Sequence, residues 1–158
     1  MRVYISGPLQ GAGDLDSARR FYDALAVMVA DLGHEAYVPH HFTDPESAGG
    51  MSANAVFTAD IEALNRADAV IAHVGLPSTG VGAEIALASA SGRRVLGVKR
   101  SSERGSRFAE GLISDTGGEV VAFGHQDELR SAVARWLSMP PAWFGSPSSI
   151  APHRRVVA

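Results

Sequence analysis

The sequence predicts a single-domain α/β protein in which helices cover both faces of a five-stranded parallel sheet. Short runs rich in β-branched residues alternate with stretches of helical periodicity along the 158 residues. One run, residues 68–74 (DAVIAHV), is apolar almost throughout, which is typical of a strand covered on both sides. Glycines and prolines follow several of these segments and indicate the turns between them.

The first half of the chain contains three predicted strands and two predicted helices. The strands are short β-branched and aromatic runs, and the helices repeat apolar side chains every three or four positions. Gly33 ends the first helix, and Ser52 is the expected cap of the second. In chain order we expect a strand at residues 2–6, a helix at 16–32, a strand at 35–39, a polar loop at 40–50, a helix at 52–67 and the buried strand at 68–74.

The second half continues the same alternation. Residues 77–92 (PSTGVGAEIALASASG) pass from a turn of small residues into an apolar helix. We then expect a strand at 94–99, a short helix at 106–114, a strand at 118–123 and an amphipathic helix at 129–137. Strands and helices in this order favour a Rossmann-like or flavodoxin-like three-layer sandwich. We expect the domain to span residues 1–139, followed by a Pro/Ser-rich C-terminal tail at 140–158.

Composition excludes several classes of function. The chain has no cysteine, so disulfides, thiolate metal sites and a cysteine nucleophile are excluded. A net charge of −3 predicts no strong attraction to nucleic acid or to a membrane surface. No apolar run approaches the roughly 18 residues that a membrane span needs, and the N-terminus lacks the apolar region of a signal peptide. We therefore expect a cytoplasmic protein.

Glu84 is the first candidate for a reactive residue, because it lies where a glycine-rich turn becomes an apolar helix. A capping box needs Ser or Thr three residues earlier, and that position is Val81. Two interpretations stay open. In the first, the carboxylate is only stabilised by the helix dipole in a first turn, by about 0.3–1 kcal/mol. In the second, the dipole keeps the carboxylate ionised so that it can react. Gly80 and Gly82 would let a ligand approach the backbone.

Asp60 is the second candidate, because the predicted helix at 52–67 places it beside small apolar residues. Val56, Ala63 and Ala67 lie on the same side of that helix. Asp60 either pairs with an arginine at the edge of the core or faces a cavity, and we favour the cavity. A second carboxylate near Glu84 suits general acid catalysis, since neighbouring carboxyl groups move each other's pKa apart.

The loop SGPLQGAG at residues 6–13 is either a plain turn or a cradle of backbone N–H groups for phosphate. Its glycines do not match the dinucleotide pattern G-x-G-x-x-G, and it lacks the Lys-Ser/Thr ending of a P-loop. Ser78 and Thr79 are expected to cap the helix that follows them, and hydroxyls there also suit contacts to phosphate or sugar.

Three histidines and one tyrosine have simpler interpretations. His40, His41 and His73 match no common spacing of metal ligands, so we expect no metal site. Tyr4 points from the first strand and belongs by default to the core. A Ser-His-Asp hydrolase would carry G-x-S-x-G, which is absent from the sequence.

With these residues identified, the chain resembles the nucleoside 2-deoxyribosyltransferase-like family, and within it the 2'-deoxynucleoside 5'-monophosphate N-hydrolases. The resemblance covers about residues 1–137, and its most specific part is G-x-G-x-E opening a helix 24 residues after Asp60. The segments that carry it are VYISGPLQGAG (3–13), VPH (38–40), ADIEALNRADAVIAHV (59–74) and PSTGVGAEIALASASGRRVLGVKR (77–100).

The resemblance implies a role for each matching residue. Glu84 would be the nucleophile that forms a covalent glycosyl intermediate, Asp60 the proton donor to the leaving base, and Tyr4 the group that orients Glu84. His40 would lie beside the base, and no metal or organic cofactor would be needed. The implied substrate-binding residues, most of them around the 5'-phosphate, are Gly7, Pro8, Leu9, Gln10, Gly11, His40, Ser78, Gly80, Gly82 and Arg107.

Two departures from the family concern the phosphate. Gln10 stands where the nucleotide hydrolases carry an arginine, and Arg would give charge-assisted bonds that Gln cannot. Family members also borrow a serine from the neighbouring subunit. In the matching stretch, Arg104, Ser106 or Arg107 would take over phosphate binding across a homodimer.

The expected function is hydrolysis of the N-glycosidic bond of nucleoside 5'-monophosphates, which releases free base and (2-deoxy)ribose 5-phosphate. One alternative is a transferase or hydrolase that acts on unphosphorylated nucleosides, since sequence does not rank attack by water against attack by a base. Another is a nucleotide-binding sensor without chemistry. A nicotinamide-cofactor domain is a further alternative, against which the first loop argues.

Overall fold

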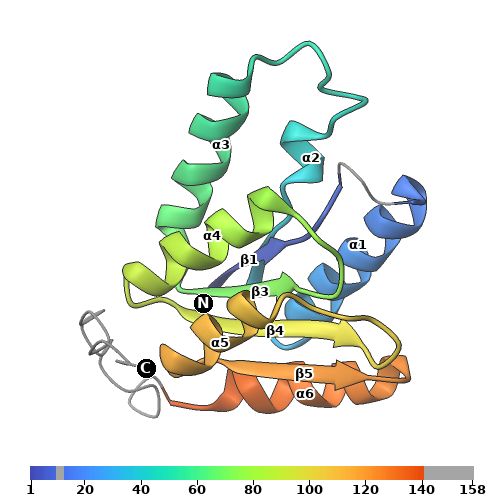
Figure 1. Cartoon of the computed structure of the whole chain (residues 1–158), viewed down its shortest axis with the longest axis vertical. Helices are drawn as coiled ribbons and strands as arrows, with labels where there is room; N and C mark the ends of the chain where they lie inside the picture. Colours follow the sequence, from blue (N-terminus) through green and yellow to red (C-terminus); the bar gives the residue numbers. More distant parts are fainter. Residues whose placement is uncertain (10–12, 141–158) are drawn as a thin grey trace, which may run out of the picture.

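The structure, a computed structural model that describes residues 1–9 and 13–140, contains one parallel sheet in the strand order β2-β1-β3-β4-β5 (Figure 1). The predicted α/β fold is confirmed. The strands are β1 (Arg2–Ser6), β2 (Glu35–Tyr37), β3 (Ala69–His73), β4 (Arg94–Arg100) and β5 (Glu119–Phe123). The helices are α1 (Leu15–Asp31), α2 (His40–Thr43), α3 (Ala53–Arg66), α4 (Thr79–Ala90), α5 (Arg107–Asp115) and α6 (Gln126–Ser138).

The strand order places a topological switch point between β1 and β3. Tyr4 of β1 pairs with Tyr37 of β2 on one side and with Val70 of β3 on the other. The chain therefore leaves β1 in one direction and later returns to its opposite edge. In sheets of this kind, ligands bind beyond the carboxyl ends of the strands at that point.

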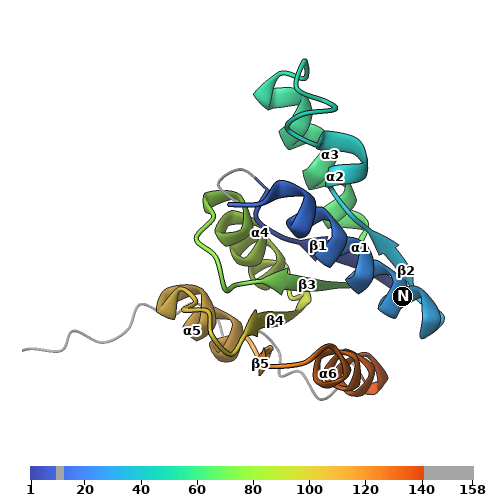
Figure 2. The same ribbon diagram turned by 90° about the vertical axis from the view of Figure 1, so that its right-hand side faces the viewer.

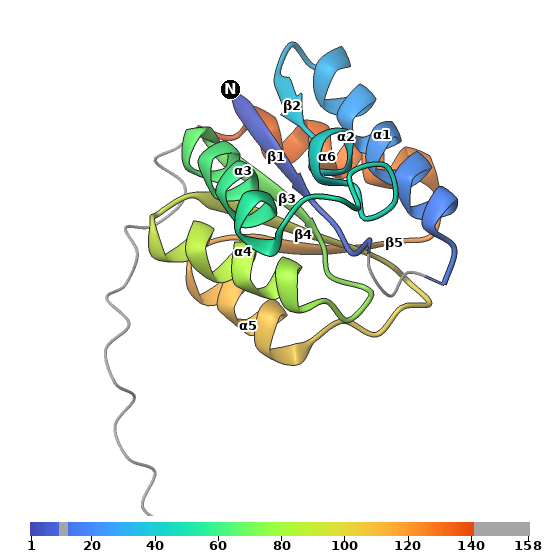
Figure 3. The ribbon, with the colours of Figure 1, turned by 90° about the horizontal axis from the view of Figure 1, so that it is seen from above.

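Helices cover both faces of the sheet, as Figures 2 and 3 show from two directions: α1 and α6 lie on one face, and α3, α4 and α5 on the other. Leu25 and Trp136 belong to the apolar cluster under the first pair, and Leu64, Ile85 and Ile113 to the cluster under the second group. Every residue of β3 is buried, which agrees with its nearly continuous apolar sequence.

Side-chain caps fix the starts of the helices that surround the sheet. Ser52, Ser78 and Ser106 each accept a hydrogen bond from the backbone N–H three residues ahead, at the starts of α3, α4 and α5. Asp14 does the same for α1, and Gly33 follows that helix with a φ of 79°, a conformation that glycine adopts without strain. The predicted cap at Ser52 is confirmed.

Two local predictions differ from the structure around Pro39. The second strand ends at Tyr37 rather than at residue 39, and the predicted loop at 40–50 begins with the one-turn helix α2. Pro39 accounts for both differences, because its ring fixes φ near the helical value and it lacks the N–H that a strand would use.

The described part of the chain contains no helix both long and apolar enough to cross a membrane. The expected tail at 140–158 lies outside the described residues, apart from Pro140.

Candidate active site

A cavity of about 290 Å³ lies beyond the carboxyl end of β1, at the switch point of the sheet. Its walls come from the loop after β1, the segment from Pro39 to Met51, α3 and the start of α4. The lining residues are Gly7, Leu9, Pro39, Thr43, Asp44, Pro45, Ala48, Gly49, Met51, Val56, Asp60, Ser78, Gly80, Val81 and Glu84. Glu84 and Asp60 therefore share one cavity.

The carboxylate of Glu84 is held by two hydroxyl groups of β1. Tyr4 donates to Oε1 over 2.7 Å, and Ser6 donates to Oε2 over 2.5 Å. Because alternate residues of a strand face the same side, Tyr4 and Ser6 both reach the face that α4 covers. Each carboxylate oxygen is thus fixed from the sheet and keeps a further lone pair.

The electrostatics of Glu84 differ from the sequence expectation. The helix begins at Thr79, so Glu84 is its sixth residue and lies beyond the first turn, where a helix dipole acts most strongly. Burial raises the pKa of Glu84, and the hydrogen bonds from Ser6 and Tyr4 oppose that increase. Burial and the charge of Glu84 raise the pKa of Tyr4 far above its usual value, so Tyr4 stays protonated and donates. Two hydroxyl donors, rather than the dipole, favour the ionised carboxylate.

Asp60 faces the cavity from α3. Its carboxylate accepts a hydrogen bond from Thr43 Oγ1 over 3.1 Å, and within residues 1–9 and 13–140 the structure gives it no arginine partner. Among the described residues the structure thus agrees with the favoured interpretation, in which Asp60 faces a cavity. Burial raises the pKa of Asp60, and the bond from Thr43 acts in the opposite direction. A raised pKa suits a carboxyl group that has to hold a proton.

The segment between α2 and α3 is tied to α1 by an ion pair. Arg19 donates to both carboxylate oxygens of Asp44, over 2.8 and 2.7 Å, and Asp44 is buried. The Arg19 guanidinium keeps the pKa of Asp44 well below its usual range, so this carboxyl stays charged. The backbone N–H groups of Glu46 and Ser47 also donate to Asp44, which fixes the loop that forms this wall.

A buried network supports the loop after β1 from behind. The hydroxyl of Tyr22 lies 3.0 Å from the carbonyl oxygen of Pro8 and 3.2 Å from Nδ1 of His73, and His73 Nε2 lies 3.0 Å from Glu103. Gly7 packs directly on Tyr22, since a Cβ at residue 7 would lie 2.2 Å from the tyrosine ring. Glycine is required there by close packing rather than by an unusual φ.

We predict that Gly7→Ala destabilises the protein by about 1–3 kcal/mol, the usual cost of overpacking a buried contact. The added methyl group would push Tyr22 away from Pro8 and displace the loop that lines the cavity. Urea unfolding of the variant measures the change. Gly111→Ala is the control, because a Cβ at this helical position meets nothing within 4 Å. Equal stability of the Gly7 variant and wild type would contradict the contact.

The start of α4 forms the opposite wall. Ser78 caps the helix by accepting from Val81 N over 3.3 Å, and both Ser78 and Gly80 line the cavity. A Cβ at Gly80 would meet only Ser78 Oγ, at 3.8 Å, so the glycine leaves space on this side. Gly82 is not among the lining residues, so the structure gives no support to its predicted contact with the substrate.

Three other predicted substrate-binding residues also lie away from the cavity lining. The side chain of Pro8 is not part of it, although its neighbours Gly7 and Leu9 are. His40 is buried and bonds through Nε2 to Asp23 of α1, because α2 turns its imidazole toward that helix. Arg107 is the first residue of α5 and is exposed. Gln10 and Gly11 lie outside the described residues.

Sequence reasoning missed three groups that contact the candidate residues. Ser6 follows Tyr4 by two positions, and the two-residue period of a strand predicts that both hydroxyls face the same side. Thr43 reaches Asp60 from the unpredicted helix α2, and Tyr22 supports the first loop from α1. No sequence signal marks these last two contacts, because they depend on how the helices pack.

Comparison with known proteins identifies the family of this chain. The sequence profile of the nucleoside 2-deoxyribosyltransferase family matches residues 3–129. A protein of Thermofilum pendens, named as a 2'-deoxynucleoside 5'-phosphate N-hydrolase, is 30% identical over 145 residues, which cover 89% of this chain and 96% of the relative. A Methanosarcina mazei protein of the same name is 36% identical over 87 residues, 52% of this chain, and the chain spans about half (51%) of that relative's length.

Solved structures with a similar fold include two enzymes. The CMP N-glycosidase of Clostridium botulinum matches with a TM-score of 0.65 and 21% identity, over 86% of this chain and 99% of its own. A 2-deoxyribosyltransferase of Bacillus psychrosaccharolyticus matches with a TM-score of 0.62 and 19% identity, over 85% and 96%. At these identities the likeness concerns the fold, whereas the profile match covers most of the chain. The chain belongs to the nucleoside 2-deoxyribosyltransferase family.

Proposed function

We propose that the protein hydrolyses the N-glycosidic bond of nucleoside 5'-monophosphates, deoxy or ribo, and releases free base and (2-deoxy)ribose 5-phosphate. One observation carries the proposal: Tyr4 and Ser6 fix the carboxylate of Glu84 in a cavity that Asp60 also lines. The names of the relatives, which concern N-hydrolysis of 2'-deoxynucleoside 5'-phosphates, support the substrate class. We assign the catalytic domain to residues 1–139.

The first step is displacement of the base. A carboxylate oxygen of Glu84 bonds to the anomeric carbon while the bond from that carbon to the base nitrogen breaks. The proton of Asp60 passes to the departing base, which takes the electron pair of the broken bond. Tyr4 and Ser6 keep the nucleophile aimed, and the other oxygen of Glu84 faces the positive charge that develops on the sugar.

The second step is hydrolysis of the glycosyl ester. Asp60, now ionised, takes a proton from water while the water oxygen attacks the anomeric carbon, and the bond to Glu84 breaks with its electrons on the carboxylate. Both residues return to their starting states. The raised pKa of Asp60 supports this assignment, because the group has to be protonated at the start of each cycle.

The experiment is a panel of nucleosides and their 5'-monophosphates, assayed for free base by chromatography. Hydrolysis of monophosphates with release of sugar phosphate is the expected result. Binding without release of any base would identify the sensor without chemistry and contradict the proposal. Exchange of an added base into the nucleoside, without free sugar, would identify a transferase.

One observation favours the alternative of unphosphorylated nucleosides. Among the cavity residues that the structure describes, Asp44, Asp60 and Glu84 are acidic and none is Lys or Arg. The undescribed part of the first loop, residues 10–12, is Gln-Gly-Ala and carries no charge. A 5'-phosphate would therefore depend on backbone N–H groups near Ser78 or on a cation from another subunit.

We propose that this cation is Arg107 of a second subunit in a cytoplasmic homodimer. Arg107 is exposed at the start of α5, and the neighbouring Phe108 exposes 82% of its surface, as an interface residue would in the free chain.

This arrangement predicts complementation between two inactive variants. Glu84→Ala and Arg107→Ala, mixed equally and allowed to exchange subunits, form dimers of which half are mixed, and each mixed dimer holds one intact site. Monophosphate hydrolysis should recover to about a quarter of the wild-type rate. If Arg107 acts within its own subunit, mixing produces no intact site and no recovery. Light scattering of the separate proteins checks that each is dimeric.

A further inference from the structure

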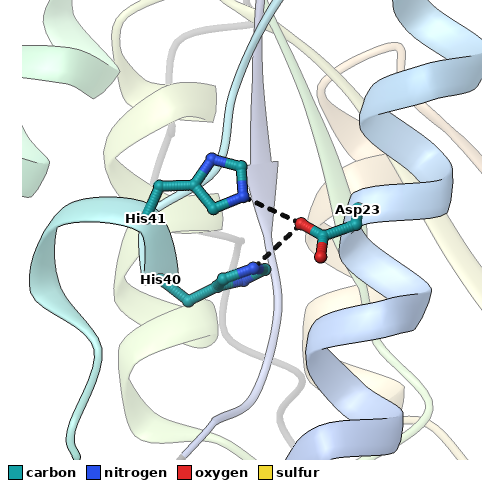
Figure 4. A group of neighbouring side chains, drawn as sticks. All are labelled: Asp23, His40 and His41. Atoms are coloured by element: carbon teal, nitrogen blue, oxygen red, sulfur yellow. Dashed lines mark hydrogen bonds and ion pairs between the residues drawn. The ribbon is translucent and has the colours of Figure 1, made fainter. Parts of the chain in front are cut away.

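Two histidines of α2 converge on one carboxylate of α1 (Figure 4). Nε2 of His40 and Nε2 of His41 each lie 2.9 Å from Oδ1 of Asp23. One ligand atom from each of the three side chains lies within 4.8 Å of the other two. None of these side chains takes part in the reaction proposed above.

One of the three side chains is buried, and the other two are accessible to solvent. The side chain of His40 is 6% exposed, whereas those of Asp23 and His41 are 49% and 51% exposed. The buried imidazole of His40 is therefore held against α1, whereas Asp23 and His41 can be reached by an ion from solvent.

We propose that Asp23, His40 and His41 form a binding site for a divalent transition-metal ion, with Zn²⁺ as the best match. Two imidazole nitrogens and one carboxylate oxygen favour Zn²⁺, Co²⁺ or Ni²⁺ over Mg²⁺ or Ca²⁺, which prefer oxygen ligands alone. An ion about 2.0–2.1 Å from each atom needs ligand atoms roughly 3.3 Å apart. The two distances from a histidine nitrogen to Asp23 would therefore widen slightly from 2.9 Å. Water from the exposed side would complete the coordination.

A bound ion would connect the cavity wall to α1. Helix α2 follows Pro39 and ends at Thr43, both of which line the cavity, and Thr43 also bonds to Asp60. The ion would replace the hydrogen bonds that now join α2 to Asp23. Its role is therefore to hold this wall in place, and it supplies no chemistry to the bond cleavage.

The test uses the full chain without a histidine tag, treated with a chelator and titrated with Co²⁺ and then Zn²⁺. We expect one Co²⁺ per chain with visible ligand-field absorption, displacement by Zn²⁺, and a melting temperature that rises with ion concentration. Mg²⁺ should produce neither effect. These measurements do not involve catalysis, so a failure of the metal-site proposal can be distinguished from a failure of the proposed hydrolysis.

Two variants separate metal binding from hydrogen bonding. Asp23→Asn keeps an oxygen that accepts from both imidazoles but removes the charge, and His41→Ala removes an exposed ligand. Both should fold, as circular dichroism will show, and lose the one-to-one binding. His125→Asn, at an exposed histidine of the α6 cap, should bind like wild type. No binding by wild type, or equal binding by all variants, would overturn the proposal and leave a hydrogen-bonded cluster.

Discussion

Glu84→Gln is expected to lower the turnover number by about 10³- to 10⁶-fold, as removal of a catalytic nucleophile does. The amide has no charge with which to attack the anomeric carbon, yet it fills the same space between Tyr4 and Ser6. Substrate affinity, measured by calorimetry, should change little. Mass spectrometry of quenched reactions should show a glycosyl adduct on wild type and none on the variant.

The stability of this variant checks that activity is lost through chemistry. Burial raises the pKa of Glu84, because keeping this carboxylate charged in the folded state costs free energy. The free energy of unfolding of Glu84→Gln should therefore equal or exceed that of wild type. Glu62→Gln, on the exposed side of α3, is the matched control and should remain active. Turnover by Glu84→Gln within about tenfold of wild type would exclude Glu84 as the nucleophile.

Asp60→Asn is expected to lower kcat by about 10²- to 10⁴-fold, the range of a lost general acid. The loss should be smallest for substrates whose base departs without needing a proton. In wild type, kcat/KM should fall on the alkaline side as Asp60 loses its proton, and the raised pKa of Asp60 moves that fall to higher pH. The variant should lack this alkaline fall.

A matched substitution tests the charge change alone. Asp127→Asn removes a carboxylate from the exposed first turn of α6 and should retain the wild-type pH profile. If Asp60→Asn lost activity equally for all leaving groups and kept the alkaline fall, Asp60 would instead act by holding the substrate.

The order of strands and helices could be predicted from sequence because it depends on local patterns. The buried run at 68–74 and the serine caps at Ser52 and Ser78 each determine their own segment. The shared cavity of Asp60 and Glu84 could also be expected, since each residue lies on a predicted helix near the switch point of the sheet. The placement of Glu84 in the first turn is wrong, because the helix that Ser78 caps begins at Thr79 and Glu84 is its sixth residue.

The contacts that could not be predicted join segments distant in the chain. His40 bonds to Asp23 across 17 positions, and Thr43 reaches Asp60 across the same separation. Both contacts depend on α2, a single turn with no apolar period of its own. Its position is set by Pro39 and by packing against α1 and α3, neither of which leaves a local pattern.

The wall from Pro39 to Met51 lies outside the repeating strand–helix units. The ion pair between Arg19 and Asp44 and the hydrogen bonds of α2 to Asp23 and Asp60 hold it in place. Glu84, Tyr4 and Ser6 are held by the sheet and α4, so they do not depend on that stretch. Changes of length or sequence in this wall can therefore alter which base is accepted while the nucleophile and its two hydroxyl donors stay in place. A randomised library restricted to residues 45–51 should yield folded enzymes with altered preference more often than one directed at β1.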